Sequence, residues 1–305
     1  MLVERGELNQ ARVVVARITS PGTLVRARAD RRVDPLLASS PELFDGAAAA
    51  ALELERLNAE VRAAPDFIEP ILLLSTGLQA SNRCDDALQL VEAAVARASG
   101  PTAEESPFRD VGENLTWLLD HRARILVCLG RWDEALQRRM RAARLTENGG
   151  SNTSQVLNLA HLLIDMDRPA DAVEVLDSVG PMSGYGKMVE QMARLRAYVA
   201  IGDDAGAQAT LAYLSDHRND SPSHYQSALL KVGQDDAAAA VLIGQLENLA
   251  TRVEVLESYQ RYGEQSEDDD APAGLLARSD VRAALERVGR IESYPYLRTS
   301  GWVGY

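Results

Sequence analysis

The chain has 305 residues, a length that suits two domains or one repeat array better than a single ordinary core. Hydrophobic residues make up 46%, aromatic residues only 5%, and 45 residues are alanine, a composition that favours packed helices over strands. The net charge of −13 repels phosphate backbones and anionic headgroups, and no apolar run of about 18 residues occurs, so neither nucleic-acid binding nor a membrane span is expected.

Residues 1–65 predict atypical N-terminal helices. The connection between Thr19 and Ser40 is expected to be irregular, because it holds two prolines and the arginines Arg26, Arg28, Arg31 and Arg32. Ser40 and Pro41 then open a long helix that runs to about Ala63, since serine followed by proline is typical of a helix start.

A helix–turn–helix signal recurs along the chain. Each copy is anchored on a residue type that tolerates a left-handed or turn backbone, namely Gly6, Asn82, Gly130, Asp167, Gly202 and Gly233. Five residues after every anchor stands an alanine: Ala11, Ala87, Ala135, Ala172, Ala207 and Ala238. An alanine lets a neighbouring helix approach closely, so Ala135 and Ala172 are expected to be buried between helices. Four residues further along, five of the six positions are apolar, and Arg139 is the exception.

These signals predict an array of helix pairs over residues 66–262. The first helices are expected at about 69–80, 108–129, 153–166, 187–201 and 223–232. The second helices are expected at about 85–98, 132–145, 169–179, 204–215 and from 235 to 246 or beyond. Acidic residues follow each anchor, and we interpret them as complements to the positive end of the second helix.

Residues 263–305 are expected to form a third segment. The preceding run from 235 to 262 contains no proline and predicts one long helix or two. The acidic stretch 264–272 is interpreted as a solvated linker, and 273–288 as a terminal helix that caps the array, because an open solenoid end exposes apolar surface.

One stretch resembles a known repeat family. Residues 126–136, Leu-Val-Cys-Leu-Gly-Arg-Trp-Asp-Glu-Ala-Leu, look like the turn of a tetratricopeptide repeat. The last four anchors are 37, 35 and 31 residues apart, close to that family's period of about 34. The family's small residue in the first helix is matched by Ala123 and Ala160 but not by Leu195 or Gln226. The resemblance implies an all-α, right-handed superhelix of antiparallel helix pairs whose concave groove binds other polypeptides.

No catalytic, cofactor-binding or metal site is predicted. The four histidines form no HxxxH or HExxH pair, and Gly180–Lys187 lacks the spacing of a phosphate-binding loop. Cys84 and Cys128 are interpreted as small core residues, with a single disulfide bridge left open. An enzyme with a hidden site is therefore the least favoured of three functions.

Arginines mark a candidate partner surface. Arg138, Arg139, Arg141 and Arg144 form a stripe on one expected helix. They are either a solvated face or a clamp for an acidic segment, since a guanidinium binds a carboxylate bidentately. We predict that Arg122, Arg124 or Arg138 holds such a segment on the concave side. Reversing the charge of Arg122 and Arg124 together is expected to weaken partner capture at least about tenfold without lowering the melting temperature.

The leading prediction is a non-catalytic scaffold that binds a protein or peptide. The alternative is a structural or homo-oligomeric assembly protein, anchored by the aromatic residues Tyr294, Tyr296, Trp302 and Tyr305. The two lysines against 30 arginines are interpreted as a genomic bias more than a functional feature, and a bacterial source is expected. The compartment stays open: the cytoplasm is favoured, and the periplasm is the alternative if a segment ahead of Met1 has been removed.

Overall fold

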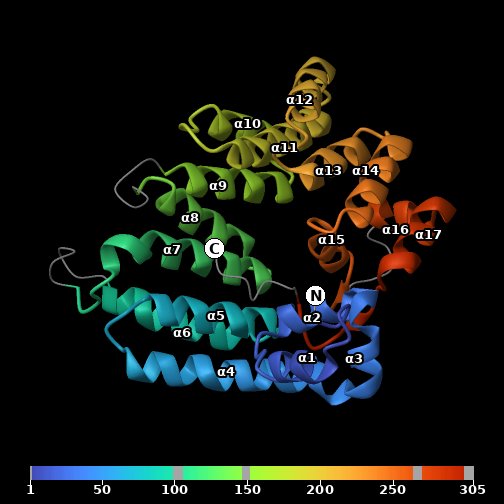
Figure 1. The fold of residues 1–305 in the computed structure, drawn as a ribbon. Helices are drawn as coiled ribbons and strands as arrows, with labels where there is room; N and C mark the ends of the chain where they lie inside the picture. The colour runs from blue at the N-terminus through green and yellow to red at the C-terminus, as the bar shows by residue number, and fades with distance from the viewer. Residues whose placement is uncertain (1, 99–105, 146–151, 264–269, 299–305) are drawn as a thin grey trace. The chain divides into compact units, whose positions relative to one another are not determined.

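The structure is a computed structural model that describes residues 2–98, 106–145, 152–263 and 270–298 (Figure 1). Of these residues 73% are helical, which confirms the all-α prediction. By its internal contacts the chain divides into two compact units. Unit 1 comprises Met1–Ala64, Leu73–Ala87 and Ala239–Tyr305, and unit 2 comprises Pro65–Leu72 and Leu88–Ala238. This division does not follow the three segments expected from the sequence, because both ends of the chain belong to unit 1.

Unit 2 holds most of the predicted helix pairs. Its complete helices are α7 (Val111–Cys128), α8 (Trp132–Ala142), α9 (Thr153–Asp165), α10 (Pro169–Leu176), α11 (Gly184–Ile201), α12 (Asp204–Asp216) and α13 (Pro222–Lys231). Each contacts the next from α7 to α13, and α11 also contacts α9 and α13. The boundaries agree with the expected ones to within a few residues. Three further helices, α5 (Glu69–Ala80), α6 (Cys84–Ala98) and α14 (Asp235–Glu247), contribute residues to both units.

The anchor residues set the turns as predicted. All six have a positive φ, from 57° at Asp167 to 74° at Gly6 and Gly202. Two backbone hydrogen bonds hold the turn at Gly130. Arg131 N donates to Leu126 O at 2.8 Å, and Gly130 N donates to Val127 O at 3.0 Å. This pattern satisfies carbonyls at the helix end, and it needs a residue that accepts the left-handed conformation. The bond that spans five residues, such as Arg131 N to Leu126 O, is present after every anchor.

The repeat alanines lie in the core. Ala135 and Ala172 are fully buried in one apolar cluster with Leu126, Leu157 and Leu176. Three more of the six, Ala11, Ala87 and Ala238, are also buried, whereas Ala207 is only partly covered. The alanines therefore mark helix–helix seams, and the prediction for Ala135 and Ala172 is confirmed.

Enlarging either seam alanine should destabilise the protein. We expect Ala135→Leu and Ala172→Leu each to lower the free energy of unfolding by about 1–3 kcal/mol, because the added methyl groups would overpack a closed seam. Ala170→Leu is the matched control, since Ala170 is an exposed residue on the same helix as Ala172. Urea denaturation measures all three. Equal midpoints for Ala172→Leu and Ala170→Leu would show that the alanine does not mark a tight seam.

Unit 1 joins the two ends of the chain. Its N-terminal elements are α1 (Leu8–Val15), α2 (Pro21–Ala29), the 3-10 turn η1 (Arg31–Val33), α3 (Asp34–Ser39), the 3-10 turn η2 (Pro41–Phe44) and α4 (Gly46–Ala63). Its C-terminal elements are α15 (Arg252–Ser258), β1 (Arg261–Tyr262), α16 (Asp270–Ala277), α17 (Ser279–Val288) and β2 (Ser293–Tyr294). The two strands pair in parallel. Helix α15 contacts α2, and α17 contacts η1.

The arginine-rich connection is helical, not irregular as expected. Ser20 caps α2 by accepting from Thr23 N, and Pro21 stands at its first turn, where proline costs no hydrogen bond. The α2 arginines reach the far end of the chain: Arg26 pairs with Glu257 and Arg28 with Glu292. These ion pairs explain why arginine is frequent in this segment, which the sequence alone did not indicate.

Other expected elements differ in detail. The helix expected to open at Ser40 begins at Gly46, after the η2 turn, with Asp45 as its cap. The run from 235 to 262 divides into α14, α15 and β1, and the expected terminal helix is the pair α16 and α17. Of the stretch 264–272 that was expected to be a linker, residues 264–269 lie outside the described residues and 270–272 belong to helix α16. No helix in the described ranges is long and apolar enough to cross a membrane.

Both cysteines are disulfide-bonded, and neither is free. The sequence left a disulfide bridge open as the alternative to two free core cysteines, and the structure has the disulfide-bonded form. Cys84 is also buried, as expected of a core residue. Disulfides persist in oxidising compartments, and in a reducing one the same side chains would be thiols.

Candidate functional site

The three arginines predicted to hold a partner all lie in unit 2, on α7 and α8. Arg122 donates from Nε to Glu92 Oε1 at 2.7 Å. Arg124 lies 3.4 Å from the carboxylate of Asp120, one turn earlier on the same helix. Arg138 makes no ion pair with any described residue, and its Nε is buried without a hydrogen-bond partner. Of the three, Arg138 is the one left available to an added carboxylate.

A buried polar cluster lies beside these arginines, and sequence reasoning missed it. Asp120 on α7 is 1% exposed, and Arg139 on α8 approaches it to 3.8 Å while donating to the carbonyl of Asn158 on α9. Burial lowers the pKa of Arg139, and the nearby Asp120 carboxylate only partly opposes this. The signal was present in the sequence, because Arg139 was the exception at the apolar seam position.

A second polar contact joins the neighbouring first helices α9 and α11. Arg196 on α11 donates to Asp165 at 2.7 Å and lies 3.4 Å from His161 Nδ1, both on α9. Burial lowers the pKa of His161 to about 4, and the positive charge of Arg196 adds to the effect. The imidazole is therefore neutral near pH 7, which lets it lie next to a guanidinium without repulsion.

The remaining histidines and the glycine-rich stretch have local roles. His217 Nδ1 lies 3.0 Å from the carbonyl of Tyr213, and His224 Nδ1 lies 2.6 Å from the hydroxyl of Ser221. Ser183 caps α11 by accepting from Gly186 N at 3.1 Å, so the stretch Gly180–Lys187 leads into a helix. Within the described ranges no group of three or more His, Cys, Asp or Glu side chains could hold a metal ion.

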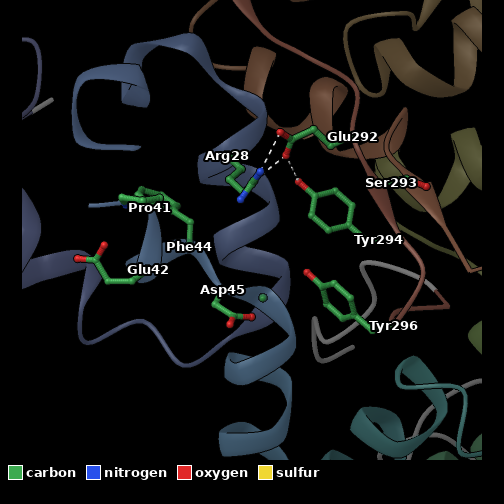
Figure 2. A pocket seen from close by; sticks show the side chains of 10 residues that line it. Arg28, Pro41, Glu42, Phe44, Asp45, Glu292, Ser293, Tyr294 and Tyr296 are labelled. Atoms are coloured by element: carbon green, nitrogen blue, oxygen red, sulfur yellow. Dashed lines mark hydrogen bonds and ion pairs between the residues drawn. The ribbon is translucent and has the colours of Figure 1, made fainter. Parts of the chain in front are cut away.

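Unit 1 contains a pocket that the sequence did not predict (Figure 2). Its volume is about 620 Å³, and it is lined by Arg28, Pro41, Glu42, Phe44, Asp45, Gly46, Glu292, Ser293, Tyr294 and Tyr296. The two tyrosines stand on one side, Pro41 and Glu42 on the other, and Arg28 and Asp45 lie between them (Figure 2). The lining comes from α2, η2, the start of α4 and the segment around β2, so it depends on the meeting of the two chain ends.

A closed ion pair forms one end of the pocket. Arg28 binds Glu292 bidentately, with Nε to Oε2 at 2.6 Å and Nη2 to Oε1 at 3.0 Å. The Tyr294 hydroxyl donates to the same carboxylate at 2.9 Å. Burial raises the pKa of Glu292, but the hydrogen bonds from Arg28 and Tyr294 outweigh it, so its pKa lies below the ordinary value. Burial and the neighbouring carboxylate raise the pKa of Tyr294, whose hydroxyl therefore stays protonated as a donor.

The start of α4 forms another part of the pocket lining. Asp45 caps this helix, and its Oδ1 accepts from Ala48 N at 3.0 Å. Gly46 follows, and a methyl group on its Cα would lie 2.1 Å from the Tyr296 hydroxyl. Glycine is thus needed here for the close approach of the tyrosine, and the phenol oxygen sits directly against the helix N-terminus.

The aromatic tail is only partly available for a self-contact. Tyr294 is 4% exposed and packs in a cluster with Val25, Ala50 and Tyr262, and Tyr296 packs against that cluster. Trp302 and Tyr305 lie outside the described residues. Two of the four residues on which the assembly alternative depended are therefore engaged within unit 1.

No protein family matches the sequence, and no curated protein matches it significantly.

Proposed function

We propose that the chain is a non-catalytic scaffold that binds a protein or peptide on the helix pairs of unit 2. We further propose that these pairs are divergent tetratricopeptide repeats wound into a right-handed superhelix. The resemblance of residues 126–136 and the four left-handed turns of unit 2, at Gly130, Asp167, Gly202 and Gly233, support this assignment.

One observation carries the binding proposal: the first helices of successive pairs are neighbours. Helix α11 contacts both α9 and α13, and α8, which carries Arg138, contacts α9, so these four helices form one continuous surface for a partner. Stacked helix pairs offer such surfaces to extended or helical partners. Polar side chains from successive helices, including Asp165 and Arg196, meet on it.

The partner class that fits best is an acidic peptide segment. Arg138 brings a guanidinium with a buried, unpartnered Nε, and on the neighbouring residues one carboxylate, Asp120, is shared by Arg124 and Arg139. A further carboxylate would restore the charge balance around these arginines and accept a hydrogen bond from Arg138 Nε.

The test must avoid the two arginines that hold carboxylates of the chain itself. Reversing Arg124 would place two acids side by side at the buried Asp120, so we now expect the double variant to have a lower melting temperature. We therefore choose Arg138→Glu and expect it to weaken binding of a labelled hexaglutamate peptide about tenfold, the loss of one charge-assisted contact. Fluorescence anisotropy at low salt measures the affinity.

The matched control is Arg62→Glu, which makes the same charge change on an exposed residue of unit 1. It should leave peptide affinity within about twofold, because an exposed charge that does not contact the peptide is screened by salt. If both variants weaken binding equally, the attraction is only a response to net charge. If neither changes it, Arg138 does not contact the peptide.

A further inference from the structure

More acidic than basic residues line the pocket of unit 1. Its lining holds one basic residue, Arg28, and three acidic ones, Glu42, Asp45 and Glu292. The charge of Arg28 is already balanced by the bidentate contact with Glu292. The carboxylates of Glu42 and Asp45 remain, and neither forms an ion pair with a described residue. An anionic ligand would therefore find no available cation here, whereas a cationic one would find the Asp45 carboxylate, since that of Glu42 points away from the tyrosines (Figure 2).

The tyrosines add groups that suit an organic cation. The rings of Tyr294 and Tyr296 meet edge to face at 6.1 Å and line the side of the pocket opposite Pro41 and Glu42 (Figure 2). The Tyr296 hydroxyl makes no hydrogen bond to any described residue, and it lies at the start of α4 next to Asp45 (Figure 2). A guanidinium or ammonium group could donate to this oxygen and to Asp45 while its charge faces an aromatic ring.

The size of the pocket argues for an organic group over a bare ion. A volume of about 620 Å³ lies within the range of small-molecule sites, about 300–1,000 Å³. A metal ion would need several ligands converging on one point, and no such group is present in the described ranges.

We propose that this pocket binds an organic cation, the guanidinium or ammonium group of a free amine or of a basic side chain. Asp45 accepts the charged donor, the Tyr296 hydroxyl accepts a second hydrogen, and the Arg28–Glu292 pair closes one end. The site lies in unit 1 and is independent of the peptide surface proposed for unit 2.

The experiment uses the full chain and three probes in isothermal titration calorimetry at low salt. Spermidine represents a free amine, and a blocked alanine–arginine–alanine tripeptide represents a basic side chain. The same tripeptide with citrulline in place of arginine keeps the shape and removes the charge. We expect saturable binding of at least one cation and none of the citrulline peptide. Which cation binds distinguishes the two sources of the group.

Two conservative variants locate the binding. Asp45→Asn removes the charge but keeps a good helix cap, and Tyr296→Phe keeps the ring and removes only the hydroxyl. Asp45→Asn should weaken cation binding about tenfold, as expected for a lost charge-assisted contact, and Tyr296→Phe should weaken it by a smaller factor. Glu55→Gln, which changes an exposed carboxylate on the helix that Asp45 caps, is the control and should bind as the parent does.

Three outcomes would overturn the proposal: no cation binds at millimolar concentration, the citrulline peptide binds equally well, or both pocket variants bind as tightly as the parent. Arg138→Glu should leave cation binding unchanged, so failure at this pocket and failure of the proposed peptide surface remain separate results.

Discussion

Replacing Asp110 by alanine is expected to lower the free energy of unfolding by about 3 kcal/mol or more. The carboxylate of Asp110 accepts from Ile68 N at 2.8 Å, from Glu69 N at 3.0 Å and from Asn114 Nδ2 at 2.9 Å. It therefore caps the start of α5 from a position 41 residues away in sequence. Ile68 is fully buried, so without the carboxylate its N–H would lose its partner where water does not reach it.

Two further variants distinguish this role from a general charge effect. Asp110→Asn keeps an acceptor oxygen and should cost roughly half as much as the alanine variant. Asp66→Ala removes a nearby aspartate whose side chain makes only an exposed ion pair with Arg109 at 3.6 Å, and should cost under about 1 kcal/mol. Guanidinium denaturation measures all three. An Asp110→Ala variant no less stable than Asp66→Ala would contradict the capping role.

Gly289→Ala should destabilise unit 1 by up to about 3 kcal/mol, at the upper end of the usual cost of overpacking. A methyl group at Gly289 would lie 2.8 Å from the carbonyl oxygen of Ala29 and 2.4 Å from a methyl group of Leu256. The Leu256 side chain can move, but the Ala29 carbonyl is held, because it accepts from Arg290 N at 2.9 Å. The contact between α2 and the residues after α17 would have to open.

Gly244→Ala is the matched control for this glycine. It lies in α14, and a methyl group there would meet nothing within 4 Å. Alanine is the better helix former, so this variant should be more stable than the parent by about 0.5–1 kcal/mol. Thermal unfolding followed by circular dichroism should therefore shift in opposite directions for the two substitutions. A Gly289→Ala protein that melts with the parent would show that the two chain ends are not tightly joined there.

The sequence by itself determined the local structure of the helix pairs. Gly130 and its counterparts predicted the turns because a left-handed residue that ends a helix is a local requirement, met within about six residues. Ala135 and Ala172 predicted the seams because helical periodicity places residues four apart on one face. Both signals depend on near neighbours in the chain, so they are readable without knowing the fold.

Only the tertiary structure decided which charged groups meet. Arg28 and Glu292 are 264 residues apart, and nothing in either segment indicates the other, so the pocket and the helical state of the arginine-rich segment escaped prediction. The same holds for Arg122, whose partner Glu92 lies on another helix 30 residues away. Charge pairing depends on distance in space and not on periodicity, and a long arginine side chain can reach any carboxylate that folding brings near.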